Sequence, residues 1–259
     1  MAPRPRGALT IRGFVTAARF LTVVPVPGRP LDGPDALGRA AGWFPLVGLA
    51  LGVVLTLVDR LLSLAFPPTV SALLVVVTWK LLTGGIHLDG LADSLDGLAG
   101  KNSAERLTIM RDSRIGVFGA LGLIVVFLVA FVALADLPLA LRDRALLLAP
   151  AVGRLAPLHL ARRFSPATPG EGSGAAFMKA VTPKAFRGGA LVVTLAAGAV
   201  LWPWGLFVLG IGVAFYWDLG YLLSRRLGGL TGDNLGAAVE VAELGVLLAF
   251  AFLHGFAKA

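Results

Sequence analysis

Three aspartates and a histidine lie within ten residues of one another, directly after an apolar stretch of the chain. These residues are His87, Asp89, Asp93 and Asp96. In a helix, residues three, four and seven positions apart share one face, so the three carboxylates would form an acidic stripe. Such carboxylates repel one another unless a cation lies among them, and oxygen ligands suit a hard ion such as magnesium. The segment therefore predicts a Mg²⁺ site, with solvated acids at a helix end as the alternative.

A second segment could bind phosphate. Arg111, Asp112, Ser113 and Arg114 combine two guanidinium groups, a carboxylate and a hydroxyl in four consecutive positions. Each guanidinium presents planar paired donors that match two phosphate oxygens. A basic collar that anchors the next span at the lipid headgroups is the alternative interpretation.

Two further segments carry acids and small residues. Glu171 lies in a glycine-rich loop that could line a phosphate or a ribose, or could be a flexible connector. Asp233 and Asn234 are typical of a helix N-terminus, where either could be the cap. Glu240 and Glu243 follow Asp233 at helical spacing inside an apolar stretch, and buried acids of this kind predict a functional site.

The composition indicates a polytopic membrane protein. Hydrophobic residues make up 57% of the 259 residues, charged residues make up 15%, and the mean hydropathy is +0.83. A soluble domain of this length cannot bury so much apolar surface. We therefore predict an all-α transmembrane helix bundle that forms one domain over residues 1–259. It has about seven spans, at 41–58, 70–87, 115–135, 145–161, 188–202, 205–223 and 237–255.

The distribution of positive charge predicts the orientation of the bundle. The net charge is +8, but no soluble module carries a basic stripe with interleaved aromatics, so nucleic acid is not an expected partner. Lys and Arg concentrate in cytoplasmic loops of membrane proteins. A cytoplasmic N-terminus leaves only Arg60, Arg142, Arg144 and Lys258 on the opposite side. All the segments with candidate chemistry then face the cytoplasm.

The N-terminal region, 1–39, is expected to be cytoplasmic. Residues 9–22 place their apolar side chains on one helical side, which is typical of an interfacial helix on the membrane surface. The chain has no cysteine, so thiolate metal sites are excluded. Inside the predicted spans, Lys80, Arg154 and Asp218 are expected to form ion pairs that hold the bundle together.

A magnesium site beside arginines favours catalysis on a diphosphate or phosphodiester, because the metal neutralises charge on the transferring and leaving oxygens. A divalent-cation transporter would also place acids inside a bundle. It would not need arginines that bind phosphate beside those acids, and this feature separates the two hypotheses.

Several motifs resemble the cobalamin synthase family, the adenosylcobinamide-GDP ribazoletransferases. The longest are GGIHLDGLAD at 84–93, IMRDSRIGVFG at 109–119 and GGLTGDNLGA at 228–237. Shorter matches are RFLTVVPVP at 19–27, WFPLVG at 43–48 and APAVGR at 149–154. Their order and approximate spacing also fit, and they extend over most of the chain.

The resemblance implies a late step of cobalamin biosynthesis at the bacterial inner membrane. The hydroxyl of α-ribazole, or of its 5′-phosphate, attacks the phosphate attached to cobinamide in adenosylcobinamide-GDP and expels GMP. The resemblance further implies that Mg²⁺ is held by Asp89, Asp93 and Asp96. One of His87, Asp112 or Asp233 would be the base.

The resemblance also implies that Arg111 and Arg114 bind phosphate oxygens. The full set of predicted substrate-binding residues is Arg111, Ser113, Arg114, Glu171, Asn234, Glu240 and Glu243. The lipid bilayer is an expected partner, and association with another copy or with other late cobalamin-assembly enzymes is a further expectation. A membrane enzyme like the CDP-alcohol phosphotransferases remains an alternative, although the Asp89 motif departs from theirs because Ala92 is followed by Asp93.

Overall fold

The computed structural model describes residues 10–170 and 172–258, and this part of the chain is helical, with a single isolated β-bridge between Pro166 and Leu230. The helices are α1 (Ile11–Leu21), α2 (Ala36–Ala40), η1 (Ala41–Trp43), α3 (Phe44–Leu62), α4 (Pro68–Leu82), α5 (Ile86–Gly97), α6 (Ser103–Ile109), α7 (Val117–Asp136), α8 (Leu139–Arg163), α9 (Gly172–Ala180), α10 (Pro183–Leu201), α11 (Trp204–Leu227) and α12 (Gly232–Lys258). The predicted all-α bundle is confirmed.

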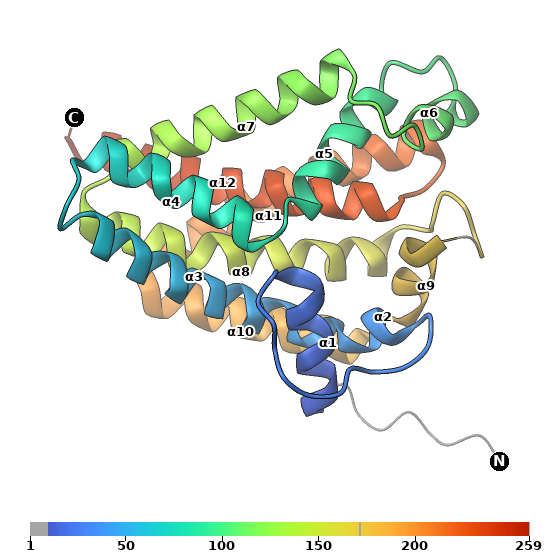
Figure 1. Cartoon of the computed structure of the whole chain (residues 1–259), viewed down its shortest axis with the longest axis horizontal. Helices are drawn as coiled ribbons and strands as arrows, with labels where there is room; N and C mark the ends of the chain where they lie inside the picture. The colour runs from blue at the N-terminus through green and yellow to red at the C-terminus, as the bar shows by residue number, and fades with distance from the viewer. Residues whose placement is uncertain (1–9, 171, 259) are drawn as a thin grey trace.

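The long helices lie side by side along the long axis of the molecule (Figure 1). Helix α8 is central and packs against α3, α10, α11 and α12, while α12 also packs against α5 and α7. The short helices α6 and α9 lie at one end of the bundle, and the C-terminus lies at the other (Figure 1). The elements that carry most of the polar motifs are therefore gathered at one end.

The seven predicted windows all fall on helical segments, but these helices differ in length and hydropathy, which decide whether a helix can cross a membrane. Five described helices, formed by Ala36–Leu62, α7, α10, α11 and α12, are long and apolar enough to do so. The pair α4 and α5 is a sixth candidate, bent by 88°. Helix α8 is not among these candidates, because it carries several charged residues along its length.

The bend between α4 and α5 corrects the predicted window 70–87. Helix α4 ends at Leu82, and the chain turns through Gly84 and Gly85, whose φ angles are 63° and 68°. Residues with a Cβ atom rarely adopt this left-handed backbone conformation, so the two glycines permit the turn. His87 consequently lies in the first turn of a new helix instead of at the end of a span.

The ion pairs predicted for Lys80 and Arg154 are confirmed. Lys80 Nζ lies 2.5 Å from Glu240 Oε2 and 3.0 Å from Glu243 Oε2, and Arg154 pairs with the other oxygen of Glu243. Asp218 makes no ion pair within the described part of the chain. These contacts join α4, α8 and α12 beneath the polar end of the bundle.

Helix α1 is amphipathic as predicted, and most of its apolar face packs on other helices of this chain. The helix packs against α2, η1 and α3 and buries Val15, Ala18 and Leu21. Its two arginines bind the proline-rich segment that follows: Arg12 donates to the carbonyl oxygen of Pro30, and Arg19 to those of Val26 and Gly28. Helix α1 is thus a wall of the bundle.

Candidate functional site

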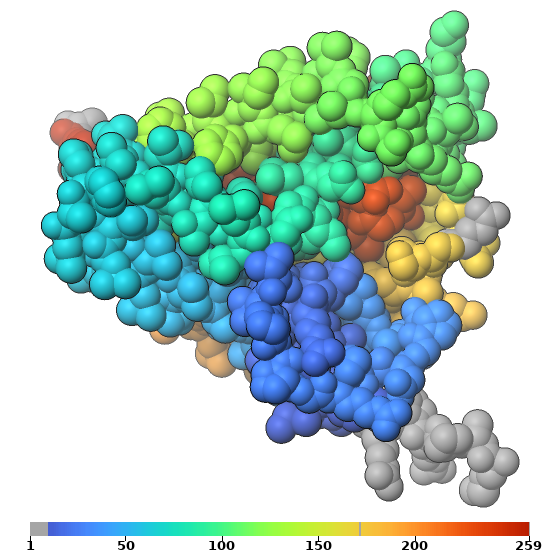
Figure 2. Space-filling model, viewed as in Figure 1, coloured from blue at the N-terminus to red at the C-terminus, as the bar shows by residue number. Residues whose placement is uncertain are grey.

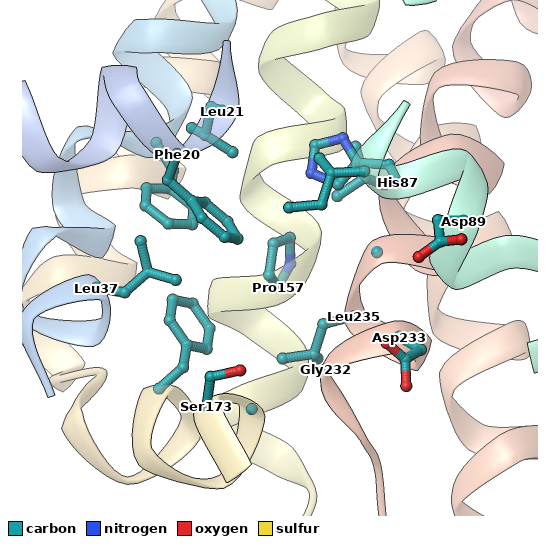
Figure 3. Close-up of a pocket in the computed structure, with 16 residues that line it drawn as sticks. Phe20, Leu21, Leu37, His87, Asp89, Pro157, Ser173, Gly232, Asp233 and Leu235 are labelled. Atoms are coloured by element: carbon teal, nitrogen blue, oxygen red, sulfur yellow. The ribbon is translucent and has the colours of Figure 1, made fainter. Parts of the chain in front are cut away.

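A cavity of about 180 Å³ opens between α1, α5, α9 and α12. Figure 2 shows the start of α12, in red, at the floor of a hollow between α5 and the N-terminal helices. The side chains divide into two groups, as Figure 3 shows: apolar groups from α1 and α2 on one side, Asp89 and Asp233 on the other. We call it the aromatic cavity, because Phe20, Phe44 and Phe177 line it.

Three helices begin at this cavity. Ile86 and Gly232, the first residues of α5 and α12, line it, as does Ser173, the second residue of α9. The first N–H groups of a helix have no partner within the helix, and the helix dipole makes this end positive. The convergence of three such ends favours the binding of an anion such as phosphate.

Glycines allow these helix ends to meet. A Cβ atom on Gly174 would lie 2.5 Å from the backbone nitrogen of Gly232, and one on Gly90 would lie 2.6 Å from the carbonyl oxygen of Asp233. Both separations are far below van der Waals contact, so a larger residue at either position would push α9 or α5 away from α12. The glycine-rich motifs therefore have a packing role.

A second cavity, of about 200 Å³, adjoins the first. The two share Ser173, Gly174, Gly232 and Asp233 as a common rim. Arg111 lines the second cavity, which we therefore call the arginine cavity. The arrangement offers two neighbouring compartments with a carboxylate, Asp233, at the boundary between them.

The predicted aspartate triad is only partly assembled. Asp89 lines the aromatic cavity. The negative charges of Asp89, Asp96 and Asp233 are close enough to Asp93 to repel a negative charge on its carboxylate. No group of three or more described His, Asp or Glu side chains is arranged to hold a metal ion. The carboxylates of α5 and α12 therefore approach one another without forming a complete cage.

Asp96, the third predicted metal ligand, contacts the backbone at the start of α7. Its two carboxylate oxygens accept hydrogen bonds from the backbone N–H groups of Gly116, at 2.7 Å, and Gly119, at 2.8 Å. Gly116 is the residue before α7 and Gly119 lies in its first turn, and N–H groups at this end lack partners within the helix. The side chain of Asp96 thus caps α7 in this structure, and its role as a metal ligand stays a prediction.

The segment 111–114 is divided between two environments. Arg111 lines the arginine cavity, whereas Asp112, Ser113 and Arg114 line neither cavity. Arg114 is exposed and forks onto Asp112, with Nη2 2.6 Å from Oδ2. Hydrogen bonds from the side chain and the backbone N–H of Arg114 lower the pKa of Asp112 to about 2. A carboxylate of such low basicity, away from the cavities, is a poor candidate for the base.

Asn234 is buried and joins two helices. Its side chain accepts a hydrogen bond from the backbone N–H of Thr231 at 2.9 Å and donates to Ser94 Oγ on α5 at 2.9 Å. Thr231 Oγ1 in turn accepts from the backbone N–H of Asn234 at 3.2 Å. The cap of α12 is therefore Thr231, not Asp233 or Asn234, and this leaves the carboxylate of Asp233 at the cavity rim.

Glu240 and Glu243 line neither cavity and are engaged in the buried ion pairs with Lys80 and Arg154. Their part in substrate binding stays a prediction. Glu171 lies outside the described residues.

His87 lines the aromatic cavity with 4% of its surface exposed, and its Nδ1 atom has no hydrogen-bond partner.

Sequence reasoning missed the apolar wall of the site. Phe20 and Phe44 belong to the motifs at 19–27 and 43–48, so a signal was present, but the first was interpreted as part of an interfacial helix. Phe177 lies on α9 in a segment with no motif of its own. Only the fold brings these three rings together.

Comparisons with known proteins identify related chains. Residues 13–251 match the family model described as cobalamin-5-phosphate synthase. The adenosylcobinamide-GDP ribazoletransferase of Roseiflexus sp. (strain RS-1) is 42% identical over 233 residues, which cover 88% of this chain and 85% of the relative. The protein of the same name from Pseudomonas syringae pv. syringae (strain B728a) is 42% identical over 246 residues, covering 93% and 99%. No solved structure matches this chain.

Proposed function

Because this chain belongs to the cobalamin-5-phosphate synthase family, we propose that it joins adenosylcobinamide-GDP to α-ribazole or α-ribazole 5′-phosphate. A hydroxyl of the ribazole attacks the phosphate attached to cobinamide, the bond from this phosphate to GMP breaks, and GMP leaves. The product is adenosylcobalamin or its 5′-phosphate. The related proteins favour neither a CDP-alcohol phosphotransferase nor a cation transporter.

The observation that carries this proposal is the pair of cavities with a common rim. A transfer between two bound substrates needs two compartments whose reacting groups meet, and the boundary here holds Asp233. We assign Asp233 as the base that takes the proton from the attacking hydroxyl. Arg111 would pair with phosphate oxygens in its cavity, and the N-termini of α5, α9 and α12 would stabilise negative charge that develops at the rim.

We further propose that the enzyme uses magnesium. The carboxylates of Asp89 and Asp93 are donors of the kind that magnesium prefers, and they are the residues that would hold it. Magnesium usually takes one or two carboxylates and completes its shell with water and substrate phosphates, so a finished protein cage is not required. When bound, the ion supplies neutralisation of charge on the diphosphate.

The orientation in a bacterial inner membrane is also a proposal, with α6, α9 and both cavities facing the cytoplasm. It is supported by the bias of Lys and Arg toward one end of the bundle and by the supply of nucleotide-activated substrates there. Single cysteines can test it, since the chain has none. An impermeant thiol reagent on intact cells should label a cysteine at Pro68 and not one at Lys101; the reverse pattern would refute the orientation.

The function itself is tested with the purified protein in liposomes. Adenosylcobinamide-GDP and α-ribazole 5′-phosphate are supplied with and without magnesium, and GMP release is measured together with formation of the cobalamin product. Release that needs both substrates and magnesium is the expected result. GMP formed without any cobalamin product would indicate a hydrolase and would refute the proposed transfer.

A further inference from the structure

We propose that the aromatic cavity binds the flat base of ribazole, while the arginine cavity receives the diphosphate of the GDP-activated substrate. This inference rests on the proposed function and deepens it, because it assigns each substrate to one compartment. It also names the residues that select the acceptor, Phe20, Phe44 and Phe177.

The three phenyl rings form a layered wall. Phe20 and Phe44 have ring centroids 6.1 Å apart with 21° between their planes, and Phe44 and Phe177 have centroids 5.6 Å apart with 22° between their planes. They come from α1, α3 and α9, so three separate helices supply nearly parallel rings to one cavity. Aromatic groups prefer such offset stacking, and a flat bicyclic base can extend it.

The apolar character of this wall distinguishes between the aromatic groups of the two substrates. Guanine carries hydrogen-bonding groups around most of its edge, and those groups need polar partners when they are buried. The neighbours of the rings in the cavity are apolar, Leu21, Leu37 and Pro157 among them. The dimethylbenzimidazole of ribazole has methyl groups on its outer edge, which suit such neighbours. The corrin ring of cobinamide is far larger than a cavity of about 180 Å³.

The opposite side of the cavity fits the sugar. His87 is buried there with an unpartnered Nδ1 atom, and Asp89 and Asp233 line the same cavity on the side away from Phe20 and Leu37, as Figure 3 shows. A ribose attached to the stacked base would extend toward these groups and could give the imidazole nitrogen a hydroxyl partner. The same pose would carry the attacking hydroxyl toward the rim, where Asp233 can accept its proton and the arginine cavity begins.

The test compares the KM values of the two substrates in variants of the wall. Phe20→Leu and Phe177→Leu keep an apolar side chain but remove the ring. We expect each to raise the KM for α-ribazole 5′-phosphate about three- to tenfold, the range expected for one aromatic contact, and to leave the KM for adenosylcobinamide-GDP within about twofold. Phe20→Tyr keeps the ring and should restore the wild-type KM. Phe252→Leu, at an exposed aromatic on α12 outside both cavities, is the matched control.

Phe20 is partly exposed, so its variant serves the test even if the more buried Phe177→Leu fails to fold. Unchanged KM values, or an equal rise for both substrates, would overturn the assignment. A rise confined to adenosylcobinamide-GDP would overturn it too and would place guanine against the wall. A wild-type protein that forms no cobalamin product would refute the proposed function itself, which is a different result from any of these.

Discussion

Helix α12 carries acids in two regions that differ in how their charge is balanced. Deep in the bundle, Glu240 and Glu243 meet Lys80 and Arg154, so two carboxylates face two cations. At the start of the helix, Asp233 approaches Asp89 and Asp93, and none of these three has an ion-pair partner within the described chain.

The difference separates structure from chemistry. Burial makes an unpaired charge costly, so acids deep in the bundle are retained together with cations of the same chain. The acids at the cavity rim have no ion-pair partner in the described part of the chain, so a bound species must balance their negative charge. A cation, a proton from a substrate, or both can fill that role, and the first two predictions below test this division.

The largest effect is expected on stability from the deep region. Arg154→Met removes one cation and leaves the Arg154-facing oxygen of Glu243 without its partner, which costs about 3–5 kcal/mol when the pair is buried. Thermal unfolding in detergent should show the loss. Arg60→Met is the matched control, because Arg60 is exposed and its pair with the partly buried Asp143 lies at the surface, where such a pair is worth about 0–1 kcal/mol. Equal losses of stability in both variants would mean that the buried ion pairs stabilise the bundle no more than a surface pair does.

At the rim the effect should fall on turnover. Asp89→Asn and Asp233→Asn are each expected to lower the rate of GMP release at least about a hundredfold, because they remove a metal donor and the base respectively. Their unfolding temperatures should remain close to that of the wild type. Asp136→Asn, at an exposed aspartate ending α7, is the control. Rim variants as active as this control would contradict the assignment.

Arginines 111 and 114 should respond differently to the same change. Arg111→Lys is expected to reduce kcat/KM about tenfold, because lysine keeps the charge but lacks the planar pair of donors. Arg114→Lys should be nearly neutral, since this side chain is 87% exposed and lies away from both cavities. Equal sensitivity of the two positions would show that the whole segment binds phosphate.

Asp96 gives the smallest expected effect. Asparagine can accept with only one oxygen, so Asp96→Asn should leave one backbone N–H of the first turn of α7 without its acceptor and cost about 1–2 kcal/mol of stability. Turnover should fall much less than in Asp89→Asn. A hundredfold loss of turnover, with the unfolding temperature unchanged, would indicate that Asp96 is a metal ligand.

The helical bundle and several site residues could be predicted from the sequence, because they depend on local patterns. Apolar stretches of span length indicate helices, and the motif around His87 and Asp89 indicates polar chemistry whatever the packing. The role of Asp96 could not be predicted, because its partners are backbone groups 20 or more residues further along the chain. Helical spacing says which residues share a face and not which element that face meets.

The same limit explains Glu240 and Glu243. Their burial was predicted from the apolar residues around them, but their partner Lys80 is 160 and 163 residues away in sequence. The glycine pair at 84–85 is a visible sign of a break, yet neither the 88° angle of that break nor the packing of α5 against α12 can be read from it. Tertiary contacts therefore determine which acids line the cavities and which form buried ion pairs.

The rim shared by the two cavities has a consequence for kinetics and stereochemistry. Substrates that meet across one boundary must be bound at the same time, so initial-rate plots should intersect, as they do for a ternary complex, and should not be parallel. With no protein nucleophile assigned between the cavities, the phosphorus atom undergoes one in-line displacement. A substrate made chiral at that phosphorus should therefore yield a cobalamin product of inverted configuration.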